Sequence, residues 1–427
     1  MRKNLFKKVL ALTLASTMAF SMVGCGSSKD SSEGKSDDGT ITLNVWHQWS
    51  NDTNELKSRY EEAVKAYEKE NPKVKIKTET LDTEAYKTKI NAEFAGDAKG
   101  IDVFYWWGAG TAKKLVDAGK VMPLDDYITD EVKSNMMEGS TSAFEYDGKL
   151  YSVPMFSWYM TLFCNKALFE KAGAKLPNTY DELADAVKKL EKLKGVTPMA
   201  AGAKDGWNAA FVYQALALRE VGATGVNEML SGKKEFGDEG YTKAAEKVKD
   251  LYEMGAFGDN PLEQGNDDAN AAFENGKAAM RIMGSWFANN VYTDKAATVK
   301  PEDVVALKIP TISDGKGEAT DYCGGFVESF WVNNNTKYKE EAAKFCIYIN
   351  EKMGVASYET GSGFSGWKTK ADESKLNPLF IQIKDLLSEG KQGVLAWDTS
   401  LEAEPAAVHN EQVQTLFADG ADIDGRT

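Results

Sequence analysis

The folded part of the chain begins with Ile41-Thr42-Leu43-Asn44-Val45-Trp46, a short apolar run typical of a β-strand. Apolar and aromatic residues then recur at helical spacing over residues 56–67, and residues 84–94 predict a second helix. Residues 74–81 and 101–105 are two further strand-like runs, one after each of these helices. Strands that alternate with helices of this length predict a parallel sheet with right-handed crossovers, so we expect an α/β fold.

Two segments rich in aromatic residues directly follow the first and third predicted strands. These are His47-Gln48-Trp49 and Trp106-Trp107-Gly108. In open α/β sheets, ligands bind in the crevice at the carboxyl ends of the strands. We therefore expect both segments to lie in loops that face a ligand.

The alternation continues through the rest of the chain. Further strands are expected at residues 149–154, 160–164, 277–283 and 304–309, and further helices near residues 209–220, 243–254, 338–351 and 402–418. Thr179-Tyr180-Asp181-Glu182 has the pattern of a capping box, in which the Thr and Glu side chains each accept a hydrogen bond from a free backbone N–H at a helix start.

Residues 1–25 predict an export signal. A basic start is followed by an apolar run over residues 9–23 that ends at Gly24-Cys25, and a run this short is typical of a signal peptide rather than of a membrane-spanning helix. Cys25 stands where bacterial lipoprotein signals carry their lipidated cysteine; the alternative is an ordinary signal peptide with an incidental cysteine. Residues 26–40 contain no apolar residue and predict a flexible tether. The expected location is the extracytoplasmic face of the cell membrane, held by a lipid anchor alone.

Composition narrows the class of protein. A chain of 427 residues is too long for one typical core, which predicts two domains. Its formal net charge of −14 argues against nucleic acid as a partner. The two histidines, His47 and His409, lie far apart in the sequence, and Cys164, Cys323 and Cys346 show no zinc-type spacing and no even-numbered disulfide framework. We expect no metal and no cofactor, while pairing among these cysteines stays open.

Ten tryptophans point toward a ligand, because several stand in Gly-, Ser- or Asn-containing stretches rather than in helical stripes. A sugar ring has an apolar face of C–H groups and a rim of hydroxyls, so flat aromatic faces and nearby polar groups suit it. For a single Trp, a place in the core is as good an interpretation.

The chain resembles the family 1 extracellular solute-binding proteins, which capture sugars for bacterial ABC importers. The resemblance is carried, in order, by Asn44-Val45-Trp46, Gly100-Ile101-Asp102-Val103-Phe104, Gly148-Lys149-Leu150-Tyr151-Ser152-Val153-Pro154, Leu162-Phe163-Cys164-Asn165-Lys166, Pro177-Asn178-Thr179-Tyr180-Asp181-Glu182-Leu183, and Phe273-Glu274-Asn275-Gly276-Lys277-Ala278-Ala279-Met280 followed by Gly284-Ser285-Trp286. It implies a two-lobed periplasmic-binding-protein type II fold, with discontinuous lobes, an interlobe cleft and a hinge of several strands. We place the first lobe at residues 40–152 plus 324–357 and the second at residues 153–323 plus 358–427.

The same resemblance implies a site in the cleft. Carried over by position, the site takes His47, Gln48, Trp49, Trp106 and Trp107 from the first lobe, and Trp158, Tyr159, Trp207, Trp286 and Trp397 from the second. Segments that often face the cleft in this family add Asp82, Glu84, Glu328 and Trp367. Trp46 is expected in the core.

The implied function is that of a monomeric lipoprotein that captures a neutral oligosaccharide and delivers it to the permease subunits of an ABC transporter, without catalysis. Gly361-Ser362-Gly363-Phe364-Ser365-Gly366 spells the dinucleotide fingerprint, but it follows a predicted helix and favours a loop. An exported glycoside hydrolase, which needs two suitably spaced carboxylates, and a surface lectin stay as alternatives. Tight binding in calorimetry without cleavage in product analysis would reject the hydrolase. Failure of the protein to restore sugar uptake in a deletion strain would favour the lectin.

Overall fold

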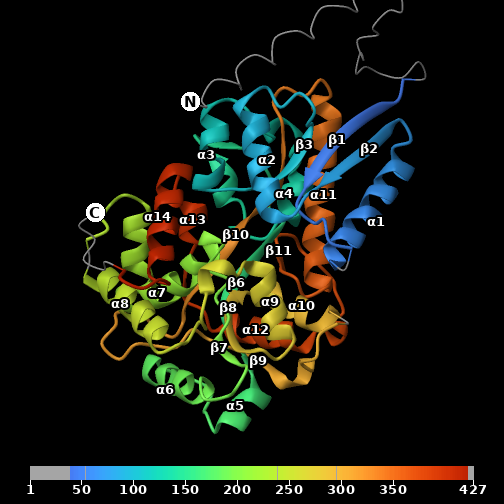
Figure 1. The fold of residues 1–427 in the computed structure, drawn as a ribbon. Helices are drawn as coiled ribbons and strands as arrows, with labels where there is room; N and C mark the ends of the chain where they lie inside the picture. The colour runs from blue at the N-terminus through green and yellow to red at the C-terminus, as the bar shows by residue number, and fades with distance from the viewer. Residues whose placement is uncertain (1–38, 53, 238, 295, 422–427) are drawn as a thin grey trace, which may run out of the picture.

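The structure is a computed structural model that describes residues 39–421 except residues 53, 238 and 295 (Figure 1). The predicted export signal with Cys25, and nearly all of the predicted tether, lie outside the described residues. Within the described part of the chain, no helix has both the length and the apolar character needed to cross a membrane.

The strands are, in chain order, β1 (Ile41–His47), β2 (Val74–Thr80), β3 (Val103–Trp107), β4 (Glu145–Tyr146), β5 (Lys149–Leu150), β6 (Phe156–Asn165), β7 (Thr197–Met199), β8 (Ala278–Gly284), β9 (Val304–Leu307), β10 (Asp321–Val332), β11 (Phe364–Ser365) and β12 (Gln392–Val394). The α-helices are α1 (Glu55–Glu70), α2 (Thr83–Ala95), α3 (Gly110–Asp117), α4 (Asp130–Asn135), α5 (Lys166–Ala172), α6 (Tyr180–Leu190), α7 (Gly206–Leu230), α8 (Glu239–Glu253), α9 (Asn266–Glu274), α10 (Phe287–Thr293), α11 (Lys339–Glu359), α12 (Pro378–Ser388), α13 (Trp397–Ser400) and α14 (Ala403–Thr415). These elements confirm the α/β class.

One sheet runs through the whole molecule in the order β2-β1-β3-β10-β6-β8-β7. Strand β1 is parallel to both β2 and β3, as the sequence predicts for the opening of the chain. Strand β10 is antiparallel to β3 and to β6, and β6 is antiparallel to β8. Beyond β3 the sheet is therefore mixed, because β7 is parallel to β8 and β12 is parallel to β10.

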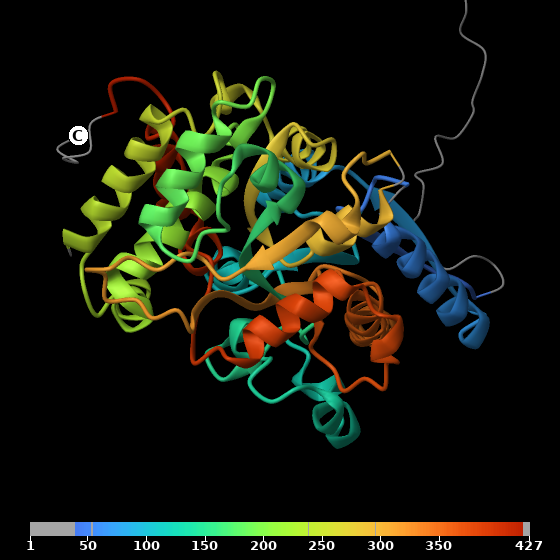
Figure 2. The ribbon, with the colours of Figure 1, turned by 90° about the horizontal axis from the view of Figure 1, so that it is seen from below.

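The apolar side chains form two separate cores. The first core draws on residues 41–156 and 330–353, together with Trp367. The second core draws mainly on residues 158–327 and 358–417, where α7 and α8 lie side by side (Figure 2). Strands β6 and β10 contribute to both cores, because Phe156 and Phe330 belong to the first while Trp158 and Cys323 belong to the second. The two long strands thus connect two lobes, in agreement with the two-lobed architecture.

The lobes also touch away from the sheet, where α3 of the first meets α13 and α14 of the second (Figure 1). The Thr111 hydroxyl donates to the backbone carbonyl of Thr399 at 3.3 Å. A Cβ at Gly110 would come closer than 3.0 Å to the carbonyl oxygens of Ser400 and Leu401, so glycine permits this close approach of the backbones.

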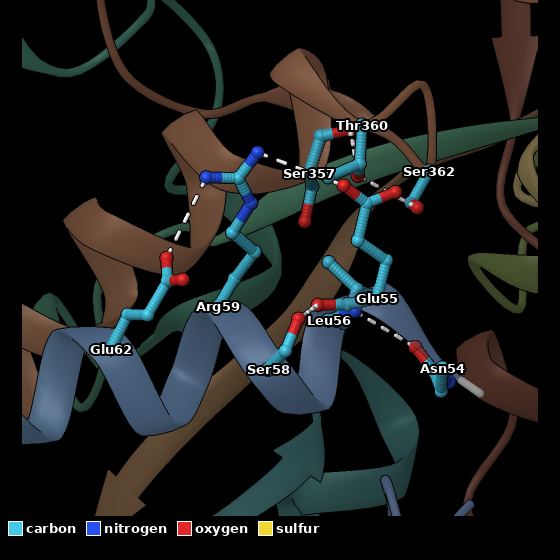
Figure 3. Close-up of polar contacts among 9 residues, drawn as sticks. All are labelled: Asn54, Glu55, Leu56, Ser58, Arg59, Glu62, Ser357, Thr360 and Ser362. Carbon is cyan, nitrogen blue, oxygen red and sulfur yellow. Dashed lines mark hydrogen bonds and ion pairs between the residues drawn. The ribbon is translucent and has the colours of Figure 1, made fainter. Parts of the chain in front are cut away.

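The glycine-rich fingerprint at residues 361–366 forms a loop, as predicted. It follows the end of α11, and the next α-helix after it begins at Pro378. At the end of α11, the Thr360 hydroxyl lies 2.9 Å from the Ser362 hydroxyl of this loop and 3.3 Å from the Ser357 carbonyl (Figure 3). The nearby start of α1 is closed by its own residues, where the Asn54 side chain accepts from the N–H of Leu56 at 2.9 Å (Figure 3).

The capping box at the start of α6 is half confirmed. The Thr179 hydroxyl accepts from the N–H of Glu182 at 3.3 Å, as predicted. The Glu182 carboxylate, however, accepts from the N–H of Asn178 at 2.7 Å, one residue earlier than in the standard motif.

Candidate functional site

Four aromatic residues of the second lobe form one cluster, which we call the second-lobe cluster: Trp158, Trp207, Phe211 and Trp286. The Trp158 ring stacks on Phe211 at 5.3 Å and meets the edge of Trp286 at 5.0 Å. Trp207 and Phe211 lie one helical turn apart on α7, with ring centroids separated by 5.2 Å. Trp207 and Trp286 are only half-buried, so their rings keep surface available for a ligand. Phe211 was missed from the sequence because it reads as an ordinary core position of a helix.

The first lobe presents Trp107 at the end of β3, where it is also half-buried. Its ring meets Tyr105 edge-on at 5.2 Å and Trp106 at 5.5 Å. The Nζ atom of Lys87, on α2, lies 5.2 Å from the Trp107 ring centroid and 5.8 Å from the Trp207 ring centroid. Tryptophans from the two lobes therefore flank one ammonium group. Lys87 was not predicted as a site residue, because a single lysine on a helix that is expected to be exposed is common.

Glu328 lies where strands from both lobes meet. On β10 it pairs with Trp107 of β3 and with Phe156 of β6. Its side chain is buried, and burial raises the pKa of Glu328 to about 8, although the neighbouring Tyr105 and Trp107 side chains favour the charged form. At neutral pH this carboxyl group is therefore largely protonated and can donate a hydrogen bond.

Four predicted site residues carry a buried polar atom that has no hydrogen-bond partner among the described residues: His47 Nε2, Gln48 Oε1, Trp106 Nε1 and Trp207 Nε1. Most buried polar atoms in folded proteins are hydrogen-bonded, so such atoms call for a partner from outside the chain or from water. They are candidate contacts for the hydroxyl groups of a ligand.

His47 and Trp49 lie in the first core rather than on a surface. His47 is 1% exposed and its ring packs 4.2 Å from Tyr60, while Trp49 is 5% exposed and lies 5.9 Å from Phe330. The His47 Nδ1 atom accepts from the N–H of Trp49 at 3.2 Å. Burial lowers the pKa of His47 to about 3, so its ring is neutral at physiological pH. Trp46 is buried, as expected.

Tyr159 is separated from Trp158 by the alternation of side chains along β6. Its ring packs against Tyr322 at 5.3 Å and Phe364 at 5.2 Å, instead of against the second-lobe cluster. It lines a small cavity of about 40 Å³ together with Arg219, whose guanidinium donates to carbonyls of Ile309, Glu318 and Asp321. Trp158 and Tyr159 were both expected to face the ligand, but their side chains lie on opposite sides of β6.

Trp367 and Trp397 are each 1% exposed, so neither can stack on a ligand in this structure. Trp367 belongs to the first core and donates from Nε1 to the carbonyl of Pro154 at 2.6 Å. Trp397 belongs to the second core, 5.7 Å from Tyr213 and 5.1 Å from His409. Both positions were expected to face the ligand, and this expectation is corrected: they are packing residues.

Asp82 and Glu84 are exposed at the start of α2. Asp82 caps the helix by accepting from the N–H of Ala85 at 3.1 Å. Glu84 forms an ion pair with Lys87 at 3.0 Å, which places it beside the two flanking tryptophans. Of these two predicted contacts, only Glu84 is brought to the aromatic site.

The described residues contain no group of three His, Cys, Asp or Glu side chains arranged to hold a metal ion. Cys164, Cys323 and Cys346 are buried and free. Burial alone raises the pKa of Cys164, so that thiol is unreactive.

The sequence matches the family of bacterial extracellular solute-binding proteins over residues 50–354. It is 24% identical to the "Multiple sugar-binding protein" of Streptococcus mutans serotype c over 393 residues, which are 88% of this chain and 86% of that protein. It is 28% identical to the "Galactooligosaccharide-binding protein" of Bacillus subtilis, over 86% of this chain and 82% of that protein.

Solved structures show the same similarity. One, described under xylan utilization by the thermophilic bacterium Caldanaerobius polysaccharolyticus, is 37% identical, with a TM-score of 0.84 over 88% of this chain and 95% of that one. A chitin oligosaccharide binding protein matches with a TM-score of 0.79 over 88% of this chain and 94% of that one, and at 24% identity it supports the fold alone.

Proposed function

The chain belongs to the family of bacterial extracellular solute-binding proteins, and from this premise we propose that it captures a neutral oligosaccharide between its two lobes for an ABC importer. The observation that carries the proposal is the pair of half-buried tryptophans, Trp107 and Trp207, which come from different lobes and flank one point. A ligand that contacts both rings would contact both lobes at once. Such a ligand favours the arrangement in which the lobes meet, because only that arrangement provides both sets of contacts.

Two kinds of interaction would recognise the sugar: aromatic stacking on its ring faces and hydrogen bonds to its hydroxyl groups. Trp107, Trp207 and Trp286 offer flat apolar faces to the C–H groups of the rings. Hydrogen bonds can come from three atoms that have no partner among the described residues: the acceptor Gln48 Oε1 and the indole N–H donors of Trp106 and Trp207. The protonated Glu328 adds a donor at the point where β3, β6 and β10 meet.

Charge favours a neutral ligand. Glu84 is ion-paired with the Lys87 ammonium at 3.0 Å, and the positive charge of Lys87 also acts on the Asp205 and Asp398 carboxyl groups. Because Glu84 already neutralises the Lys87 charge, this cation offers little attraction to an anionic sugar. We expect a neutral xylo-oligosaccharide to bind at least about 10-fold more tightly than the same backbone carrying a glucuronic acid, as measured by calorimetry. Equal affinities would contradict this reasoning.

The family and the relatives named above guide the search for the ligand. A thermal-shift screen should compare xylo-, chito-, malto- and galacto-oligosaccharides of two to six units, followed by isothermal calorimetry of the best ligands. Chromatography of each sugar after incubation tests the proposal that binding occurs without cleavage. Tight binding with an intact sugar supports a transport role, and release of shorter products would refute it.

We also propose that the protein is a monomer held by a lipid on Cys25 at the extracytoplasmic face, where it delivers its ligand to the permease. The lobes would then be residues 40–152 plus 324–357 and residues 153–323 plus 358–427, with β6 and β10 as the hinge. Cys25→Ser should release the protein into the medium or the soluble fraction. Retention of the variant in the membrane fraction would contradict the anchor.

A further inference from the structure

Lys87 has an unusual position for a lysine of an amphipathic helix. Its side chain is 29% exposed, and its Nζ lies within cation–π distance of a tryptophan from each lobe, at 5.2 Å from Trp107 and 5.8 Å from Trp207. Trp107 ends strand β3 of the first lobe, whereas Trp207 is the second residue of helix α7 of the second. Lys87 itself is on α2, so its ammonium reaches across from the first lobe to the second.

The charge of this ammonium also acts on two aspartates of the second lobe. Burial raises the pKa of both Asp205 and Asp398, and the positive charge of Lys87 opposes each shift. Asp205 immediately precedes α7, and its carboxylate accepts from the N–H of Asn266 at 2.6 Å, which fixes the loop that carries Trp207. The attraction therefore acts between elements that are held rigidly in their own lobes.

We propose that Lys87 is a lobe-bridging residue, whose ammonium stabilises the arrangement in which the two lobes meet by binding Trp107 and Trp207 together. Separation of the lobes would remove the second-lobe half of these contacts, while the ion pair with Glu84 on the same helix would persist. Lys87 therefore favours lobe closure specifically, and it positions Trp207 opposite Trp107 for the ligand. The effect on ligand binding rests on the proposed function, but the effect on lobe closure does not.

A control for this interaction lies two residues further along the same helix. Lys89 Nζ is 5.9 Å from the Trp46 ring and pairs with Glu93 at 3.3 Å, and all of these groups belong to the first lobe. Lys87→Met and Lys89→Met remove one charge each from α2 and keep a similar side-chain length. Lys87→Arg keeps a cation that can stack on indole rings.

The decisive measurement is hydrogen–deuterium exchange of the protein without sugar, followed at residues 109–113 and 397–402, where the lobes touch. Lys87→Met should speed exchange there about 3- to 10-fold, the range expected for loss of a partly exposed cation–π contact, while Lys89→Met and Lys87→Arg should stay near wild type. Unchanged exchange in Lys87→Met, or equal acceleration in Lys89→Met, would overturn the proposal.

The second readout is the dissociation rate of xylotetraose, or of another sugar from the screen that binds, from the wild type and the variants. Lys87→Met should dissociate about 3- to 10-fold faster than wild type and than Lys89→Met. Tighter binding would overturn the proposal, because it would mean that Lys87 competes with the ligand instead of bridging the lobes. If the wild-type protein binds none of the sugars, the proposed function fails, and the exchange measurement still decides the role of Lys87.

Discussion

Gly284 offers a way to move Trp286 without deleting it. Gly284 ends strand β8, and a Cβ built there would lie closer than 3.0 Å to three carbons of the Trp286 ring. The backbone at Gly284 is not in the left-handed region, and the three atoms nearest to the added Cβ of Gly284→Ala all belong to the ring. Non-bonded carbons prefer separations of about 3.5–4.0 Å, so the indole must shift by about 1 Å or more.

The shift has two measurable consequences. Displacing the ring weakens its edge-on contact with Trp158, which is 5.0 Å away, and should cost about 0.5–1.5 kcal/mol of unfolding free energy. It also misaligns a stacking face of the proposed sugar site. We expect ligand affinity to fall about 5- to 30-fold, close to the effect of Trp286→Ala, which corresponds to about 1–2 kcal/mol.

Urea unfolding followed by fluorescence measures the first effect, and calorimetry with the best sugar measures the second. Gly100→Ala is the matched control, because a Cβ at Gly100 meets nothing within 4 Å. This control should bind normally and change stability by no more than about 0.5 kcal/mol. A folded Gly284→Ala protein with wild-type affinity would refute the role of Trp286 in the ligand site.

Two further substitutions separate protonation and packing from ligand contact. Burial raises the pKa of Glu328 from 4.5 to about 8, so its neutral form stabilises the fold at low pH, and this contribution is lost as pH rises toward 8. Between pH 5 and pH 8, the unfolding free energy of the wild type should therefore fall relative to that of Glu328→Gln, by at most about 1.4 kcal/mol per pH unit. Parallel pH profiles of the two proteins in urea unfolding would contradict this. Trp367→Phe removes the 2.6 Å hydrogen bond to the Pro154 carbonyl inside the first core, so the unfolding free energy should fall by about 1–3 kcal/mol. Sugar affinity should stay unchanged. A weakened affinity in calorimetry would mean that Trp367 contacts the ligand.

Local patterns were sufficient to predict much of the fold. The first strand was expected at residues 41–46 and runs from Ile41 to His47, and the helix expected at residues 84–94 runs from Thr83 to Ala95. Each of these features depends on a few neighbouring residues. Trp106 and Trp107, which were expected in a loop after the third strand, are instead the last two residues of β3, at its carboxyl end.

Burial of individual tryptophans could not be predicted in the same way. Trp286 and Trp397 both stand in short polar stretches, yet one keeps exposed surface and the other is 1% exposed within a ring of Tyr213, Phe236, Tyr241 and His409. Those four partners come from three segments that are distant in sequence. Local sequence carries no signal for a contact among residues that are distant in sequence. The position of Lys87 between Trp107 and Trp207 could not be predicted for the same reason.

Strand direction across the hinge has a similar cause. The chain leaves the first lobe along β6 and returns to it along β10, so these strands must run in opposite directions whatever their local sequence. The pair Gly324-Gly325 shows how the two strands come together: Gly324 has φ of 139°, and a Cβ there would lie closer than 3.0 Å to the Trp158 carbonyl oxygen. The register then shifts between Phe326 and Glu328. This shift sets Glu328 opposite Phe156 of β6, while the regular pairing with β3 sets it opposite Trp107, so the Glu328 carboxyl group lies where strands of both lobes meet.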